Sequence, residues 1–194
     1  ISLVIALTGP ISNVIYMKDW WKPIAFVGPK VGIIESLLVA FSIGGIMAVI
    51  YEDVFKKKIK LRKNRNKSND NKRLFFLMIS SAILMFALFY LFNLNSFWAI
   101  NLCLIYAVAV ILYHRPDLVV EACISGVLMF FIASFVYNGL EFLTPGWIDA
   151  FWYWQNVPRI IFLNVPIDDA INYLLIGAFV GTLYEYWQEG RCVP

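Results

Sequence analysis

The feature that most constrains this chain is a series of long apolar stretches. Each holds about twenty mostly apolar residues, enough for a helix to cross a hydrocarbon layer about 30 Å thick. Five of them are expected to span a membrane: Val31–Phe55, Leu74–Phe92, Phe97–Tyr113, Leu118–Tyr137 and Ile167–Trp187. A sixth span is indicated by residues 1–17, ISLVIALTGPISNVIYM, which has no charged n-region and so resembles the trimmed end of a helix more than a signal peptide.

Composition agrees with this pattern. The chain is 61% hydrophobic and only 15% charged, which is too apolar for a soluble domain of 194 residues. We therefore predict an all-α integral membrane protein, a bundle of about six transmembrane helices forming one domain over residues 1–194.

The basic residues predict the orientation of the bundle. Residues 56–73, KKKIKLRKNRNKSNDNKR, hold ten of the sixteen basic residues, so the positive-inside rule makes this loop cytoplasmic in a multi-pass protein of the cell membrane. Counting spans from there places Arg115 and Arg191 inside as well, against four basic residues outside. The loop has no interleaved aromatic residues, so nucleic acid is not an expected partner.

Two segments of the chain align without a gap. Residues 34–52, IESLLVAFSIGGIMAVIYE, match residues 167–185, IDDAINYLLIGAFVGTLYE, at a constant offset of 133. Four spans separate each helix from its copy, so both copies run in the same direction and predict a parallel repeat about an axis along the membrane normal. The first repeat half covers about residues 1–93 and the second about 96–194. Small residues spaced by four in both copies would allow close helix packing, namely Gly44, Ala48, Gly177 and Gly181.

Carboxylates open both copies of the aligned helix. Asp168 and Asp169 follow Pro166, and Glu35 occupies the equivalent of Asp168 in the first copy. One interpretation is a helix cap, because acids are stabilised at a helix N-terminus. The other is catalysis, because acids at the edge of an apolar run are costly, and one of a desolvated pair keeps its proton nearer neutral pH. We therefore predict Asp168, Asp169 and Glu35 as catalytic residues.

Substrate contacts are predicted around these acids. Asn172 lies one turn below Asp168 on the same helix face, and Tyr173 follows it. Residues 145–164 are aromatic but too polar to cross, which indicates an interfacial helix or a re-entrant lid, or else an ordinary aromatic belt. A lid would present aromatic faces to a polyene or a carbocation, from Trp147, Phe151, Trp152 and Trp154.

Other acids are assigned different roles. Glu121, just inside a predicted span, is a further candidate for substrate contact. Glu52 and Glu185 lie seventeen residues beyond the upper acids, about 26 Å along a helix, and read most simply as interfacial anchors. The three cysteines have no metal-like spacing, so no metal site, cofactor or disulfide framework is expected.

The sequence resembles the membrane-embedded lycopene cyclase domain family of the heterodimeric or fused type, with an archaeal-like pattern. Members carry a Pro-x-Glu-Glu signature at the head of a transmembrane helix, and NVPIDDAINYLLIGAFVGTLYEYW, residues 164–187, matches its second-half form. GIIESLLVAFSIGGIMAVIYEDVF looks like the first-half form, and NSFWAINL, HRPDL and ISGVLMFF resemble the intervening pattern. The chain departs from the signature in having Asp168 and Asp169 for the two glutamates, and only one acid and no proline in the first half.

The resemblance implies a carotenoid end-group cyclase. Such an enzyme protonates the terminal double bond of a lycopene-like carotenoid, closes the ring through a carbocation and loses a proton, without net redox change and without a metal. Two alternatives are a non-enzymatic carotenoid- or lipid-binding membrane subunit, and a prenyl-lipid transferase, whose Asp-rich magnesium motifs are not found. The expected partners are a carotenoid or another long apolar lipid and the bilayer, and a homo- or hetero-oligomer is left open.

Overall fold

A computed structural model of the chain describes residues 1–22, 32–62, 67–155 and 157–193. Almost all of the described structure is helical, in the order α1 Ser2–Tyr16, α2 Ile33–Met47, α3 Ile50–Phe55, α4 Lys67–Phe86, η1 Ala87–Leu91, α5 Ser96–His114, η2 Pro116–Leu118, α6 Val119–Leu143, α7 Trp147–Phe151 and α8 Ile167–Gln188. The strands are short and form two small antiparallel pairs, β1 Lys58–Leu61 with β4 Gly190–Val193 and β2 Ile161–Phe162 with β3 Val165–Pro166.

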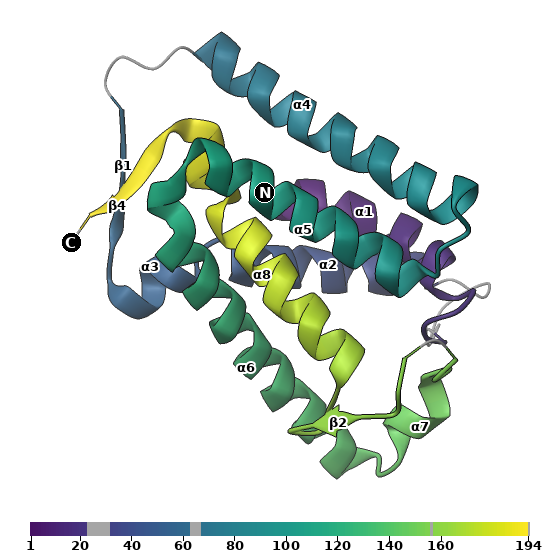
Figure 1. The fold of residues 1–194 in the computed structure, drawn as a ribbon. Coiled ribbons are helices and arrows are strands. Elements are labelled where there is room, and N and C mark those ends of the chain that lie inside the picture. Colours follow the sequence, from purple (N-terminus) through teal and green to yellow (C-terminus); the bar gives the residue numbers. More distant parts are fainter. Residues whose placement is uncertain (23–31, 63–66, 156, 194) are drawn as a thin grey trace.

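Helix α8 lies at the centre of the molecule, between α6, α5 and α2 (Figure 1). Its contact with α6 is close, because glycines on both helices remove side chains from the crossing. A Cβ added to Gly126 of α6 would lie 2.5 Å from the carbonyl oxygen of Leu174, and one added to Gly177 of α8 would lie 2.8 Å from the Cβ of Met129. Small residues therefore bring the two backbones together, as the spacing of Gly177 and Gly181 predicts.

Helices α1 and α2 form an antiparallel pair beside this centre. Near one end Asn13 donates a hydrogen bond to Ser36, and near the other Gly44 packs directly against Ile5. Helix α4 covers α5 from outside, and Tyr106 of α5 donates to Ser80 of α4 at 3.0 Å.

The all-α membrane class is confirmed. Four helical stretches are long and apolar enough to cross a bilayer within the described residues: Ile33–Phe55, Lys67–Leu91, Ser96–His114 and Pro116–Leu143. Helix α8 is not among them, because Asn172, Glu185 and several tyrosines lower its apolarity, and α1 has only 15 residues. A bundle of six spans therefore stays a prediction.

The predicted span 31–55 corresponds to the apolar stretch Ile33–Phe55, within which a turn at Ala48 and Val49 separates α2 from α3. The basic loop that follows ends earlier than predicted. Helix α4 begins at Lys67, inside the predicted loop 56–73, and Lys58–Leu61 of that loop pairs with β4. The repeat halves 1–93 and 96–194 meet in the bend before α5, but their relationship by duplication stays a prediction.

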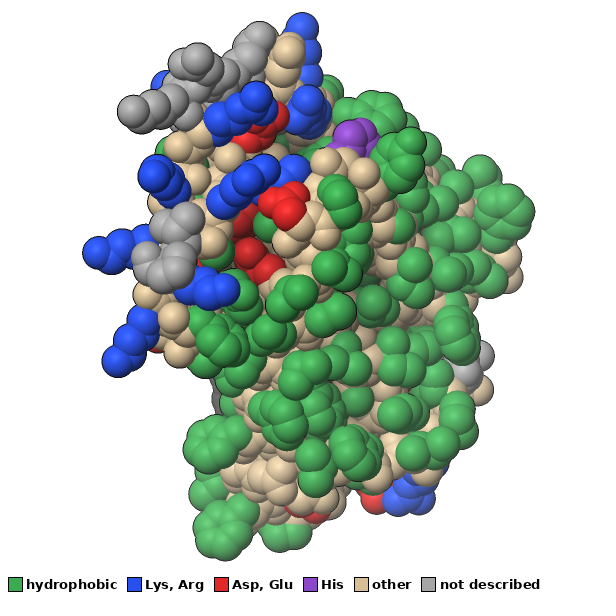
Figure 2. All heavy atoms as spheres, turned by 60° about the vertical axis from the view of Figure 1, so that its left-hand side comes forward, with side chains coloured by type: hydrophobic (Ala, Val, Ile, Leu, Met, Phe, Trp, Pro, Cys, Tyr) green, Lys and Arg blue, Asp and Glu red, His purple; other side chains and the backbone are tan. Residues whose placement is uncertain are grey.

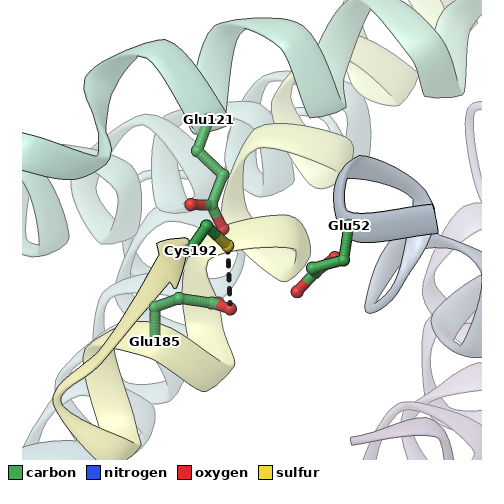
Figure 3. A group of neighbouring side chains, drawn as sticks. All are labelled: Glu52, Glu121, Glu185 and Cys192. Carbon is green, nitrogen blue, oxygen red and sulfur yellow. Dashed lines mark hydrogen bonds between the residues drawn. The ribbon is translucent and has the colours of Figure 1, made fainter. Parts of the chain in front are cut away.

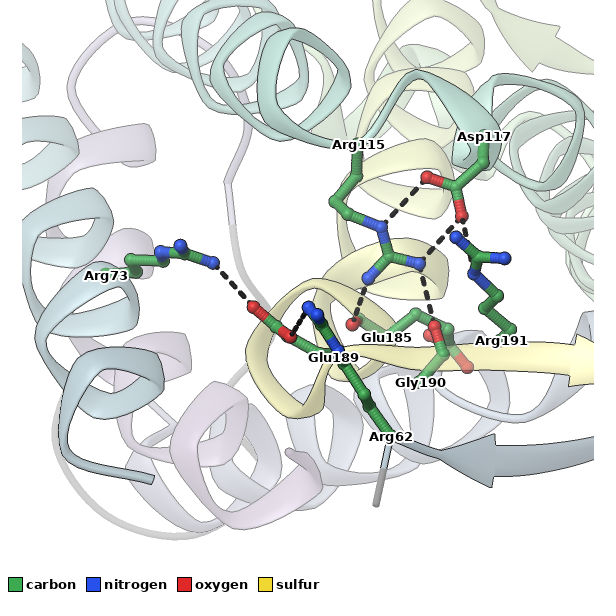
Figure 4. Close-up of polar contacts among 8 residues, drawn as sticks. All are labelled: Arg62, Arg73, Arg115, Asp117, Glu185, Glu189, Gly190 and Arg191. Atoms are coloured by element: carbon green, nitrogen blue, oxygen red, sulfur yellow. Dashed lines mark hydrogen bonds and ion pairs between the residues drawn. The ribbon is translucent and has the colours of Figure 1, made fainter. Parts of the chain in front are cut away.

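Basic side chains gather at one end of an otherwise apolar surface (Figure 2). Glu189 draws two of them together, since it pairs with Arg62 at 3.1 Å and with Arg73 at 2.9 Å. Arg115 is the centre of a second group of polar contacts. Its guanidinium donates to the carbonyl oxygens of Glu185 and Gly190 and pairs with Asp117 (Figure 4). We call this part of the molecule the basic end; it includes β1, β4 and the last turn of α8.

The segment that follows α6 covers the other end of α8. Helix α7 and the β2–β3 pair lie there (Figure 1). Trp152, directly after α7, forms an antiparallel bridge with Trp21, which follows α1. Lys22 donates its amide to the carbonyl of Phe151 at 2.8 Å, and Tyr153 donates to the carbonyl of Trp20 at 3.1 Å. The aromatic stretch 145–164 therefore folds as a cap on the protein, and its depth relative to a membrane stays a prediction.

Candidate functional site

Asp168 lies in the first turn of α8, at the end covered by this cap. Pro166 precedes the helix in an extended conformation, so the chain turns into α8 with Asp168 pointing inward, and its side chain is 0% exposed. Trp20 donates its indole N–H to Oδ2 of Asp168 at 2.7 Å. Oδ1 of Asp168 has no hydrogen-bond partner in the described part of the chain.

Asp169 is less enclosed and has a different partner. Its side chain is half-buried and accepts a hydrogen bond from the hydroxyl of Tyr137, on α6. The ring of Tyr137 in turn contacts Trp147 at 5.1 Å and Tyr173 at 6.3 Å between ring centroids. The adjacent carboxylates are thus held by side chains from two different parts of the chain.

An aromatic cluster surrounds the two acids. Its buried members are Trp20, Phe97, Phe130, Tyr137, Ile148, Trp152, Val165 and Ala170. The predicted contact residues Trp147, Phe151, Trp154 and Tyr173 pack against it, and Trp152 belongs to it. The indole N–H groups of Trp147 and Trp154 have no acceptor among the residues described. Five of the residues predicted to contact substrate are therefore brought together at Asp168.

The remaining predicted residues are placed as follows. Asn172 is half-buried one turn below Asp168 and donates a weak hydrogen bond to Asn101 of α5 at 3.4 Å. Glu35 is half-buried in the first turn of α2, next to Ser36, which is bonded to α1. Thus Glu35 lies on the α1–α2 pair, whereas Asp168 and Asp169 are bonded to Trp20 and Tyr137.

A small polar cavity lies beside the aromatic cluster. It has a volume of about 420 Å³ and is lined by Lys18, Asp19, Phe89, Tyr90, Asn93, Leu94 and Asn95. Asp19 also caps α5 by accepting from the amide of Ser96 at 3.0 Å and from its hydroxyl. Because Trp20 follows Asp19 in sequence, the start of α5 and the bond to Asp168 are fixed by the same turn.

Glu121 belongs to a second group of acids, at the basic end of the molecule. One ligand atom from each of Glu52, Glu121, Glu185 and Cys192 lies within 4.8 Å of the others (Figure 3). We call these four residues the acid–thiol cluster. Helix α8 separates it from Asp168 by seventeen residues, about 26 Å, so Glu121 does not join the aromatic cluster.

The acid–thiol cluster was not predicted. Glu52 and Glu185 were interpreted as interfacial anchors, but Glu185 is 0% exposed. The one signal in the sequence was the Tyr-Glu pair that ends both aligned segments, since Glu52 and Glu185 are equivalent there. Burial and then the carboxylates of Glu121, Glu185 and Glu52 raise the pKa of the Cys192 thiol.

Comparison with known proteins identifies the domain. Residues 95–187 match the family model for lycopene cyclase. This region of the chain is similar to the lycopene cyclase family. No curated protein and no solved structure matches the chain. The resemblance drawn from the sequence is thereby confirmed at the level of the family.

The matched region extends from the start of α5 almost to the end of α8. It contains Asp168, Asp169, Tyr137 and the aromatic cap that covers them. Trp20, which donates to Asp168, comes from a segment before the matched region. The first part of the chain therefore completes the surroundings of an acid that belongs to the matched region.

Proposed function

We propose that this chain is a carotenoid end-group cyclase of the lycopene type, acting within the membrane by a proton-initiated reaction without net redox change. The family match supports carotenoid cyclisation in general terms. The arrangement around Asp168 supports the specific chemistry. The proposal extends to an intramolecular lyase or isomerase activity, since the product is an isomer of the substrate.

Asp168 is the proposed general acid. In its protonated form it donates a proton to the terminal carbon–carbon double bond of the carotenoid, which leaves a carbocation on the more substituted carbon. The neighbouring double bond supplies the electron pair for the new ring bond, and the positive charge moves to its far carbon. Loss of a proton from an adjacent carbon restores a double bond, so atoms and charge balance.

The observation that carries this proposal is the burial of Asp168 among aromatic side chains. Asp168 is 0% exposed, and its Oδ2 accepts the indole N–H of Trp20 at 2.7 Å. An acid held away from water among apolar side chains suits protonation of a hydrocarbon.

The other residues have supporting roles in the proposal. Asp169, bonded to Tyr137, sets the protonation of its neighbour or receives the proton that leaves. Rings of Trp147, Trp152 and Trp154 stabilise the carbocation through their π faces. Glu35 serves as the acid or base of the first-half site. Because these aromatic side chains pack closely in this structure, entry of a chain end requires the cap to move.

Pigment analysis in lycopene-producing bacteria tests the proposal. Expression of the chain should yield cyclic carotenoid, and Asp168→Asn should lose at least about 99% of it, since a missing general acid costs roughly 10²–10⁴-fold. Asp53→Asn, at an exposed position of α3, is the matched control and should retain cyclisation. Unchanged lycopene from the intact, membrane-inserted protein would favour the non-enzymatic binding subunit instead.

A further inference from the structure

The acid–thiol cluster has no part in the proposed cyclisation, yet it concentrates ligand groups from four elements. Glu52 comes from α3, Glu121 from α6, Glu185 from α8 and Cys192 from β4. The first and last of these residues are 140 positions apart in the sequence, so only the folded structure brings all four together. The Sγ of Cys192 lies 3.9 Å from Oε1 of Glu185.

Two carboxylates of the cluster are buried with an oxygen left unpaired. The side chain of Glu185 is 0% exposed and that of Glu121 is 5% exposed. Oε2 of Glu185 and Oε1 of Glu121 have no hydrogen-bond partner within the part of the chain that the structure describes. Both carboxylates point into the cluster (Figure 3). Buried acceptors without donors are costly unless a cation or a proton satisfies them.

The positive side chains at this end of the molecule are engaged with other groups. Arg115 donates to the carbonyl oxygens of Glu185 and Gly190 and pairs with Asp117. Lys57 donates to the hydroxyl of Tyr51 at 2.7 Å. These bonds place positive charge beside the cluster but do not satisfy its buried carboxylate oxygens.

We propose that the acid–thiol cluster binds a divalent transition-metal ion, with Zn²⁺ as the best match. Zinc accepts carboxylate oxygen and cysteine sulfur ligands and favours four-coordinate tetrahedral sites. Bonds of about 2.0–2.3 Å place neighbouring ligand atoms roughly 3.5 Å apart. The ligand atoms lie within 4.8 Å of one another. Side-chain rotations that move these atoms by about 1 Å would therefore bring all four to bonding distance of one ion. The thiolate ligand disfavours Mg²⁺ and Ca²⁺, which prefer oxygen ligands alone.

A metal ion at this position holds α3, α6, α8 and β4 together. It stabilises the folded chain because the unfolded chain does not present the four ligands at once. The site is about 26 Å from Asp168 along α8, so its role is structural and independent of the proposed cyclase chemistry.

Metal binding by the purified full chain tests this proposal. The protein in detergent micelles is stripped with a chelator, dialysed against Zn²⁺ and analysed for metal content and thermal unfolding. We expect about one equivalent of zinc for each chain and a higher Tm with zinc than with chelator. Less than about a tenth of an equivalent, with the same Tm in both conditions, would overturn the proposal and leave protons as the occupants.

Variants locate the ion. Cys192→Ser and Glu185→Gln should reduce the zinc-induced rise in Tm by more than half. The matched controls Cys123→Ser, exposed on α6, and Glu189→Gln, outside the cluster, should retain it. Full retention in Cys192→Ser and Glu185→Gln would contradict the assignment.

A spectroscopic readout avoids dependence on how the variants fold. Co²⁺ in place of Zn²⁺ should give the near-ultraviolet charge-transfer band of a cobalt–thiolate bond in the wild-type chain and in Cys123→Ser. Bound Co²⁺ without that band in the wild type would show that Cys192 is not a ligand and would refute this donor set.

Discussion

Trp20 and Asp168 lie 148 residues apart in the chain and are joined by one hydrogen bond of 2.7 Å. The sequence singled out Asp168 because acids rarely open an apolar helix. It could not identify Trp20 as the partner, because tryptophans at membrane interfaces are common and a pairing between distant segments has no local signal. The same holds for Tyr137, which the sequence left as an ordinary span residue.

Removal of the indole donor should weaken cyclisation without removing the acid. Trp20→Phe keeps an aromatic ring but deletes the N–H bonded to Asp168. The indole N–H stabilises the carboxylate that forms as Asp168 gives up its proton. A hydrogen bond to such a charged group is worth about 1.5–3 kcal/mol, so we expect ring formation to slow by roughly 10-fold or more. The rate of cyclic carotenoid formation in membranes measures this. Trp187→Phe, which loses a bond to Asn71 at the other end, is the control and should cyclise normally.

Glu189 makes stability depend on pH. Burial opposes its ionisation, but the bonds and charges of Arg62 and Arg73 outweigh burial and lower the pKa of Glu189. Since the pKa is lower in the folded than in the unfolded chain, these pairs stabilise the fold above the unfolded pKa of about 4.3 and lose that effect as the pH falls through the folded value.

The comparison of Glu189→Gln with the wild-type chain measures this effect. The variant should be less stable at pH 7 by no more than about 1 kcal/mol, because both arginines are largely exposed. The difference should shrink towards zero near about pH 3. Thermal unfolding in detergent at both pH values provides the measurement, and an equal difference at the two would rule out the ion pairs as its source.

At the scale of elements, the crossing of α6 and α8 holds the proposed site together. Asp168 and Asp169 belong to α8, Tyr137 belongs to α6, and the helices touch through glycine. The sequence predicted small-residue packing on α8 from its spacing of four. It did not predict that α6 would be the helix packed against α8, because this spacing is common to many membrane helices and does not identify the neighbouring helix.

Gly126→Ala tests the crossing. A methyl group there would meet the carbonyl oxygen of Leu174, so the helices must move apart, at a cost of about 1–3 kcal/mol. The matched variant Gly139→Ala, also on α6, has no atom within 4 Å of the added carbon and should be neutral or slightly stabilising. Thermal unfolding of both variants in detergent tests this prediction. Equal Tm values for Gly126→Ala and Gly139→Ala would contradict the close packing of α6 on α8.

Helix existence was easier to predict than helix ends. Apolar runs located α5 and α8 to within about a residue, because each run of mostly apolar residues extends almost to both ends of its helix. The start of α4 was missed because residues 67–73 are polar, and polar residues can extend a helix beyond a membrane. The break between α2 and α3 lies in an apolar run that contains no proline or glycine at the break, so no local signal marks it.

At the scale of the whole molecule, the two acid groups lie at opposite ends of α8. The basic end carries β1, β4 and the acid–thiol cluster, and the capped end carries Asp168. Glu52 and Glu185, equivalent in the aligned segments, meet in one cluster. That meeting is consistent with the predicted duplication about an axis along the membrane normal, and the repeat itself stays a prediction.

The distribution of charge predicts that the basic end is cytoplasmic. A fluorescent-protein fusion after Pro194 should therefore fluoresce in bacteria, whereas a periplasmic phosphatase fused at the same point should be inactive. A second phosphatase fusion, after Thr144 at the start of the cap, should be active. The reverse pattern would place Asp168 at the cytoplasmic face and overturn the predicted orientation.

The most direct test of the central claim, that Asp168 starts cyclisation by donating a proton, is deuterium incorporation. The purified chain in liposomes is supplied with lycopene in D₂O, and the mass of the cyclic product is measured. Because the acid exchanges with solvent, each ring formed should contain one deuterium, and Asp168→Asn should form no ring. A cyclic product without deuterium, or equal ring formation by Asp168→Asn, would contradict the account.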